Sequence, residues 1–166
     1  MVYGINIGNT NSSAAVSQSN RVAVIANAGG EHRSRSVVAK GQEAEMAVGT
    51  AALNSRNTVT FGDIIATFSQ EGASHVISKQ VLTVINYTET IKRVQSGGLT
   101  QNIRVDSLLG ALVGNIAETC RDALASGEMC VLAVSDEWSQ EQSAEFKSIV
   151  EQVTKVKSKK YLKILT

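Results

Sequence analysis

The chain has 166 residues, of which 43% are hydrophobic and 19% charged, and its formal net charge is +1. This length fits one domain or two small subdomains with a shared core, and the composition excludes a disordered chain. The near-neutral charge gives no support to a basic nucleic-acid-binding surface, and no stretch approaches the ~18 apolar residues of a membrane span. No basic leader precedes a long apolar run, so we expect a cytoplasmic protein without a signal peptide or membrane segment.

Short strands joined by tight turns are predicted for the first forty residues. Residues 2–7 alternate as a strand does, and Gly8 to Asn11 predict a turn because these residue types tolerate unusual backbone angles. Further strands are expected at 12–17, 21–27 and 34–40. Adjacent short strands of this kind favour an antiparallel or mixed sheet.

The pattern changes in the middle of the chain. Residues 43–54 are rich in Ala and Glu and predict a short helix, and residues 60–68 predict a second one. Residues 75–94 contain several β-branched side chains and predict two or three strands, followed by a turn at 96–98.

The last third predicts helix, strand, helix and strand in that order. Apolar residues recur at helical spacing from Val105 to Ser126, and Gly127 is expected to end that helix. Residues 130–134 are a continuous apolar run typical of a buried strand. A last strand is expected at 159–165, and a crossover helix between the two strands allows them to be parallel.

The helix between those strands has a clear start signal. Ser139 and Gln142 have the spacing of a capping box, in which each side chain bonds the other residue's backbone N–H. The helix is expected to continue to about Val153, with Phe146 and Ile149 on its inner face. Trp138, just before it, is interpreted as a packing residue.

The candidate binding feature is the glycine-containing turn in GINIGNTNS, residues 4–12. Glycine allows backbone N–H groups to approach a phosphate closely, and Asn9 and Thr10 add side-chain hydrogen-bonding groups. No Gly-Lys-Ser/Thr follows, so this is not a Walker loop. On this loop alone, an ordinary hairpin turn is the favoured interpretation.

Five segments in order resemble the DnaK-type (heat-shock-seventy) chaperone family, with spacing close to that of the family. These segments are GINIGNTNSSAAV, VIANAGGEHRSRSVVAK, VGTAALNSRNTV, CVLAVSDEWSQEQ and KKYLKILT. Residues 69–100 are too divergent to align. Within the family, VIANAGGEHR and the missing catalytic residues are most similar to the atypical subunit of the fungal ribosome-associated complex.

The resemblance implies an α/β fold: an actin-like or ribonuclease-H-like lobe with a mixed sheet and flanking helices. Residues 1–39 and 105–166 would form the core lobe, and residues 40–104 a small inserted α+β subdomain. The second phosphate loop, the adenosine pocket and the glutamate of the family's Asn-Glu-Pro segment would lie beyond Thr166.

The resemblance also assigns site residues. The implied phosphate-binding residues are Gly8, Asn9, Thr10 and Asn11. Asn6 stands where the family has an aspartate that organises magnesium waters, so a hydrated metal should be held less well. Asp63, or Gly62 if one residue is deleted, stands where the family has its catalytic lysine. Neither supplies the positive charge that phosphoryl transfer needs.

These departures imply a protein that is not an enzyme: a non-hydrolysing chaperone-cofactor lobe. It would bind ATP weakly and only with a second lobe, and binding of magnesium is an open possibility. It would act in co-translational folding at the ribosome through a J-domain partner similar to zuotin. The alternatives are a truncated actin-like ATPase fragment and a stand-alone interaction domain without a nucleotide role. Self-association of a truncated lobe is a further candidate, because exposed apolar surface invites a partner.

Other residues received structural interpretations. His32 and His75 were expected to lack ligand-spaced partners, and the acidic pairs Glu43/Glu45 and Asp136/Glu137 to be solvated. The basic run Lys155, Lys157, Lys159 and Lys160 is interpreted as a solvated helix end, with ribosomal RNA contact as the alternative.

Two further features of the composition have no role in binding. Cys120 and Cys130 are expected to be buried thiols, with a disulfide left open. The chain has no proline, although the family places one in the segments aligned with Ser36, Ser55 and Ser135. Loss at such sites should raise the entropy of the unfolded chain.

Overall fold

The computed structural model describes residues 1–41, 45–56, 58–80, 83–88, 91–95, 100–126, 128–133, 137–155 and 162–165. The strands are β1 (Val2–Ile7), β2 (Asn11–Gln18), β3 (Arg21–Ile25), β4 (Ser34–Arg35), β5 (Val38–Lys40), β6 (Met46–Val48), β7 (Val59–Phe61), β8 (Val76–Gln80), β9 (Thr83–Thr88), β10 (Ile91–Gln95), β11 (Thr100–Arg104), β12 (Met129–Ala133) and β13 (Leu162–Leu165). The helices are α1 (Thr50–Asn54), α2 (Ile64–Glu71), α3 (Val105–Thr119), α4 (Arg121–Ala125) and α5 (Gln140–Thr154). The fold is therefore mixed α/β, as predicted.

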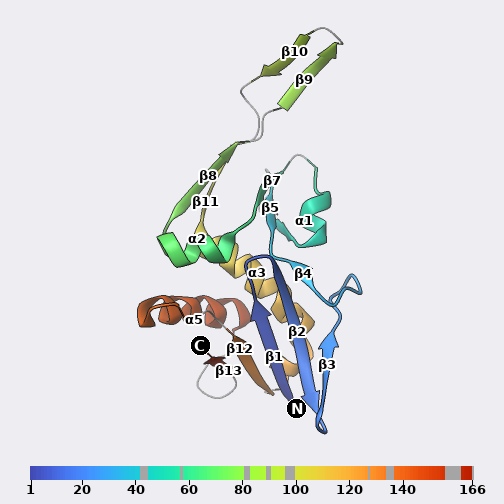
Figure 1. Ribbon diagram of the computed structural model, residues 1–166, viewed down its shortest axis with the longest axis vertical. Coiled ribbons are helices and arrows are strands. Elements are labelled where there is room, and N and C mark those ends of the chain that lie inside the picture. The colour runs from blue at the N-terminus through green and yellow to red at the C-terminus, as the bar shows by residue number, and fades with distance from the viewer. Residues whose placement is uncertain are drawn as a thin grey trace.

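A six-stranded mixed sheet forms the lower body of the molecule (Figure 1). Its strand order is β13-β12-β1-β2-β3, with β4 pairing the first residues of β2. The hairpin β1–β2 and the pair β2–β3 are antiparallel, whereas β1–β12 and β12–β13 are parallel. The predicted crossover helix is α5, which joins the parallel strands β12 and β13.

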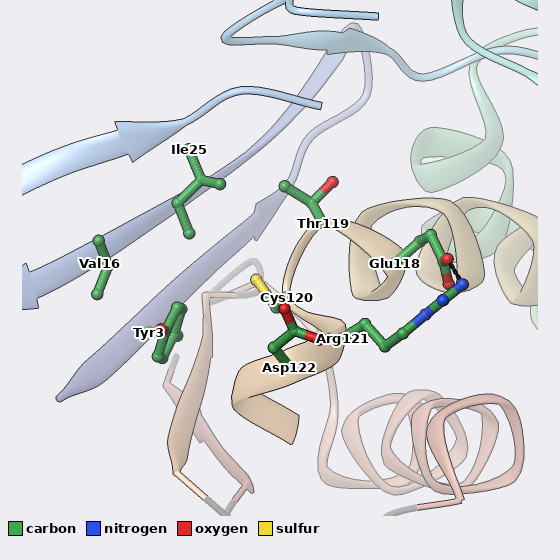
Figure 2. A pocket seen from close by; sticks show the side chains of 8 residues that line it. All are labelled: Tyr3, Val16, Ile25, Glu118, Thr119, Cys120, Arg121 and Asp122. Carbon is green, nitrogen blue, oxygen red and sulfur yellow. Dashed lines mark ion pairs between the residues drawn. The ribbon is translucent and has the colours of Figure 1, made fainter. Parts of the chain in front are cut away.

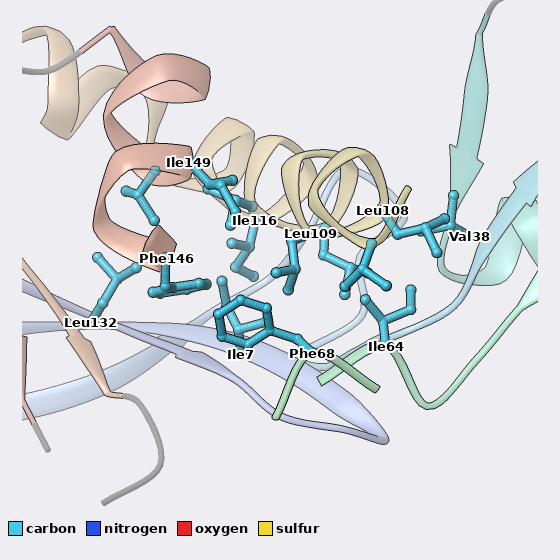
Figure 3. Close-up of a cluster of buried hydrophobic side chains, with 14 of the residues drawn as sticks. Ile7, Val38, Ile64, Phe68, Leu108, Leu109, Ile116, Leu132, Phe146 and Ile149 are labelled. Carbon is cyan, nitrogen blue, oxygen red and sulfur yellow. The ribbon is translucent and has the colours of Figure 1, made fainter. Parts of the chain in front are cut away.

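One face of this sheet carries the core, because alternate residues of each strand point toward the helices. Ile5 and Ile7 on β1, Ala14 on β2 and Leu132 on β12 are all buried. They pack in one cluster with α3 and α5 side chains that include Leu109, Ile116 and Phe146, drawn in Figure 3. The opposite face stays open: the β1 residues between the buried ones are exposed.

The middle of the chain forms three smaller sheets. Strands β5, β6 and β7 form one antiparallel sheet, and the pairs β8–β11 and β9–β10 form two ribbons. In Figure 1 these ribbons extend away from the six-stranded sheet. The division into a core lobe (1–39 and 105–166) and an inserted subdomain (40–104) stays a prediction.

Two predicted elements of the first half were wrong in part. The strand expected at 34–40 is divided, because Ser36 donates its backbone N–H to Thr10 O and the chain then joins a different sheet through β5. In the helix expected at 43–54, Met46–Val48 is a strand, and among the residues described there Thr50–Asn54 alone is helical. Gly49, with φ 72°, separates the two.

The two remaining corrections concern helix boundaries. Residues 60 and 61 of the expected 60–68 helix belong to strand β7, which pairs with β5, and α2 begins only after Asp63. The helix expected from Val105 to Ser126 is interrupted at Cys120, whose backbone angles (φ −108°, ψ 17°) are not helical. Gly127 and the turn at 96–98 lie outside the described residues.

Several local predictions are confirmed. Both hydrogen bonds of the capping box are present, Gln142 N to Ser139 Oγ at 3.1 Å and Ser139 N to Gln142 Oε1 at 3.0 Å. Trp138 is a packing residue, 8% exposed, and Cys120 and Cys130 are buried. Within the described ranges, no helix combines the length and apolar character that crossing a membrane requires.

Candidate functional site

The turn between β1 and β2 is tightly closed. Gly8 donates its backbone N–H to Asn11 O at 3.1 Å, and a Cβ at Gly8 would lie 2.7 Å from that same oxygen. Real Cβ atoms almost never approach an oxygen that closely, so the turn requires glycine here. Thr10 O accepts the N–H of Ser36 at 2.9 Å, which joins the turn to the chain beyond β4.

Asn9 connects this turn to the start of α2, more than fifty residues later in the chain. Its Nδ2 donates to Asp63 Oδ1 at 2.8 Å, and its Oδ1 accepts the backbone N–H of Ala66 at 3.0 Å. Asp63, the N-cap residue of α2, has left-handed backbone angles (φ 49°, ψ 34°) and makes no capping hydrogen bond with its own side chain. Asn9 therefore caps α2 from a distant part of the chain, since its oxygen takes one of the helix's free N–H groups.

The other end of α2 is also held by side chains. Ser69 Oγ accepts the indole N–H of Trp138 at 2.7 Å, and Ser69 O accepts Nε2 of Gln142 at 2.8 Å. Gln142 is the capping-box residue of α5, so one amide joins both helices. The turn, α2 and the start of α5 therefore form one hydrogen-bonded unit.

The structure brings the predicted site residues together only in part. Asn9 uses both polar side-chain atoms on α2, whereas Thr10 is exposed at the tip of the turn. Asn11 begins β2 opposite Arg35, and Asn6 is exposed on the open face of the sheet in register with Ser13. Binding of phosphate or magnesium by these residues stays a prediction.

The charge beside the turn is negative. The Asp63 carboxylate is hydrogen-bonded to the turn through Asn9, and Gly62 before it is exposed and carries no side chain. Among the residues that the structure describes, no salt bridge involves Asp63. The alignment had already pointed to Asp63, but its contact with Asn9 could not be predicted from the sequence.

A second polar site was missed in the sequence. Asn27 Oδ1 accepts the backbone N–H groups of Gly29 and Glu31, and the Glu31 carboxylate accepts the hydroxyl of Thr50 at 3.0 and 3.1 Å. These residues line a cavity of about 490 Å³ that Asn115 and other residues of α3 close on the far side. The pattern Asn-x-Gly was the only available signal, because asparagine side chains often bond the backbone two residues on.

The remaining candidates have structural surroundings. His32 is exposed, but His75 does have a ligand-spaced carboxylate, contrary to expectation: its Nδ1 lies 3.9 Å from Glu71 Oε2. No cluster of three or more metal-ligating side chains occurs in the described ranges. Burial raises the pKa of Cys120 and Cys130 to about 11, so these thiols stay protonated at neutral pH.

Some predicted residues are exposed or lie outside the described ranges. Lys155 and Glu45 are exposed, as is Glu137. Glu43, Asp136 and the lysines at 157, 159 and 160 lie outside the described residues.

Comparison with known protein families gives a match. The sequence model of the Hsp70 protein family matches residues 2–134. No curated protein sequence matches the chain. Members of this family bind ATP or ADP with magnesium and typically work with J-domain co-chaperones. Since the match covers most of the chain, from β1 through β12, the chain belongs to the Hsp70 family and is a chaperone-type nucleotide-binding lobe.

Proposed function

We propose that this chain is a non-hydrolysing Hsp70-type cofactor lobe that contributes to nucleotide binding only together with a second lobe. The observation that carries the proposal is the hydrogen bond of Asn9 to Asp63 at 2.8 Å. It brings a carboxylate beside the turn, and the family resemblance assigns the catalytic lysine to Asp63 or to the neighbouring Gly62.

The residues present fit a nucleotide phosphate poorly. Gly8 keeps the close backbone turn, but the Asn9 side chain already donates one N–H to Asp63 and accepts the N–H of Ala66. A carboxylate beside the turn repels a phosphate group bound there, whereas phosphoryl transfer needs cations around the developing charge. Asn6 also lacks the charge that would help to hold hydrated magnesium. No catalytic step is therefore derived for this chain.

The partner proposal rests on family membership. Because Hsp70 proteins typically work with J-domain co-chaperones, we propose a J-domain partner similar to zuotin, and a role in co-translational folding in the cytoplasm. The resemblance of VIANAGGEHR to the atypical subunit of the fungal ribosome-associated complex supports this finer assignment. Residues 40–104 are proposed as the inserted subdomain of the lobe.

The experiment is isothermal titration of the chain with magnesium-ATP, together with a phosphate-release assay. We expect no micromolar binding and no hydrolysis by the unaltered chain. Two variants separate charge from structure: Asp63→Asn removes the charge but keeps an acceptor for Asn9, and Asp63→Lys reverses the charge. Titrated in the presence of a second Hsp70 lobe, which the proposal requires for binding, the variants should bind ATP more tightly in that order, by about tenfold for lysine, equal to about 1.4 kcal/mol.

The matched control is Glu145→Lys, which makes the same charge change at an exposed residue of α5. It should leave ATP affinity unchanged. Micromolar ATP binding and turnover by the unaltered chain would favour the ATPase-fragment alternative instead. No response of either Asp63 variant to ATP would favour a stand-alone interaction domain.

The ribosome proposal has its own test. Co-sedimentation with ribosomes should depend on the J-domain partner and not on the chain's own basic run. Replacing Lys155, Lys157, Lys159 and Lys160 with alanine should therefore leave co-sedimentation of the two-protein complex unchanged. A loss of co-sedimentation in this variant would instead indicate direct contact with ribosomal RNA.

A further inference from the structure

Strand β3 forms an open edge of the six-stranded sheet. It is last in the strand order, and in Figure 1 no element lies beyond it. Its residues Arg21 to Val24 are all exposed, with Val22 74% and Val24 51% exposed. A strand edge of this kind presents unpaired backbone N–H and C=O groups to any chain that can extend the sheet.

This edge lacks the devices by which proteins normally block such pairing. Natural edge strands use charged residues, proline or bulges to prevent addition of another strand. From Val22 to Ile25 the strand is entirely apolar, and its pairing with β2 is regular over all five residues. The only charge, Arg21, stands at its first position.

The inner face of the same edge is open as well. Val16 and Ile25 lie on the helix-facing side of β2 and β3, yet α3 ends before it covers them. A cavity of about 460 Å³ remains there, lined by Tyr3, Val16 and Ile25 on the sheet side and by Glu118 and Asp122 among others on the helix side. Figure 2 shows the three sheet residues facing the junction of α3 and α4 across this cavity.

We propose that β3 pairs antiparallel with β3 of a second copy of this chain, around a two-fold axis at Ala23. The pairing continues the sheet from one copy into the other. On the outer face it places Val22 opposite the second copy's Val24, and Val24 opposite the second copy's Val22. The exposed valines therefore cover each other. A two-fold interface is self-complementary by construction, so one edge supplies both sides.

Charge complementarity selects a second copy as the occupant. Arg21 stands opposite Gln18 in the sheet. Because it is four residues from Ile25 on the same strand, its side chain lies on the same, helix-facing side. In the two-fold pairing, Arg21 of one copy therefore stands opposite Ile25 of the second copy. That places it at the second copy's cavity, which the second copy's Asp122 also lines. Glu118 is already paired with Arg121, whereas neither Arg21 nor Asp122 has an ion-pair partner among the described residues. The dimer forms two Arg21–Asp122 pairs.

The test is sedimentation velocity over a concentration series, without nucleotide, so its outcome is independent of the nucleotide proposal. A five-residue edge and two ion pairs predict a weak dimer, with a dissociation constant on the order of micromolar or above. Arg21→Glu and Asp122→Arg should each weaken dimerisation at least about tenfold, because each creates two like-charge contacts.

An equimolar mixture of these two variants is the decisive sample. In the mixed dimer both contacts are attractive again, so association should return to within about threefold of the unaltered chain. Val24→Lys should abolish the dimer by charging the edge, while Val76→Lys, at a similarly exposed valine of β8, should have no effect. Far-ultraviolet circular dichroism confirms that each variant is folded. A chain that stays monomeric, a mixture no better than its separate components, or a dimer that tolerates Val24→Lys would each overturn the proposal.

Discussion

Trp138 donates its indole N–H to the hydroxyl of Ser69, 2.7 Å away and 69 residues earlier in the chain. The indole ring also packs edge-on against Phe68 and Phe146, with centroid distances of 4.9 and 5.2 Å. Trp138 therefore joins α2 to the start of α5 through both a polar and an aromatic contact. Because Asn9 holds the other end of α2, this contact is part of the support of the β1–β2 turn.

Ser69→Ala should lower the free energy of unfolding by roughly 1–3 kcal/mol, because it leaves the largely buried indole N–H without its acceptor. Urea unfolding followed by far-ultraviolet circular dichroism measures this directly, and it also applies to a variant without the chain's one tryptophan. Ser148→Ala, at an exposed serine of α5, is the matched control and should change stability by less than about 0.5 kcal/mol. In a Trp138→Phe background the effect of Ser69→Ala should shrink, since the donor is gone. Equal effects in both backgrounds would contradict this role of the hydrogen bond.

Substitution by alanine should change the free energy of unfolding in opposite directions at two glycines, one in β1 and one in the turn that follows it. At Gly8 a Cβ would lie 2.7 Å from Asn11 O, so Gly8→Ala forces the turn open and should destabilise by roughly 1–3 kcal/mol. At Gly4 a Cβ meets nothing within 4 Å, so Gly4→Ala should stabilise by about 0.5–1 kcal/mol through lower entropy of the unfolded chain. Thermal unfolding of both variants tests the pair, and a stable Gly8→Ala protein would show that the turn is less constrained than its geometry indicates.

The contact between α3 and α5 depends on Gly110 and Gly114. A Cβ at Gly110 would lie 3.5 Å from Val153 Cγ2, an ordinary contact, but one at Gly114 would lie 3.3 Å from Cγ1. Gly110→Ala should therefore raise stability by about 0.5–1 kcal/mol through helix propensity, while Gly114→Ala gains less because Val153 must move. In a Val153→Ala background the two substitutions should become equivalent. A persistent difference there would mean that Val153 is not the constraint.

Local signals in the sequence predicted local structure well. The capping box at Ser139 and Gln142 is present in full because all its partners lie within four residues. The β1–β2 hairpin and the buried strand β12 were also predicted, because the apolar pattern of each strand is contained in a few consecutive residues. The family resemblance indicated that Asp63 lies at the site, but it did not predict any contact of the Asp63 side chain.

Predictions failed where tertiary contacts override propensity. Residues 46–48 contain good helix formers, yet they pair with β5 as a strand. The helical pattern from Val105 onward continues through Cys120 without a sequence signal for the interruption there. The bridge from Asn9 to Asp63 and Ala66 joins residues more than fifty positions apart, which no single-sequence pattern encodes.

Because two thiols are buried, we expect the folded chain to lose stability in alkaline solution. Burial raises the pKa of Cys120 and Cys130 from 9.0 to about 11. Between these values the unfolded chain releases thiol protons while the folded chain keeps them, so the free energy of unfolding falls as pH rises from about 9 to about 11. Below pH 9 this contribution is fully present. Urea unfolding in the presence of reductant, from neutral pH to 11, should therefore show a steeper decline for the unaltered chain than for the Cys120→Ala/Cys130→Ala variant. Both proteins keep Tyr3 and every lysine, so the difference between their profiles reports the thiols together with their charge effect on the pKa of Tyr3, and parallel profiles would refute the assignment.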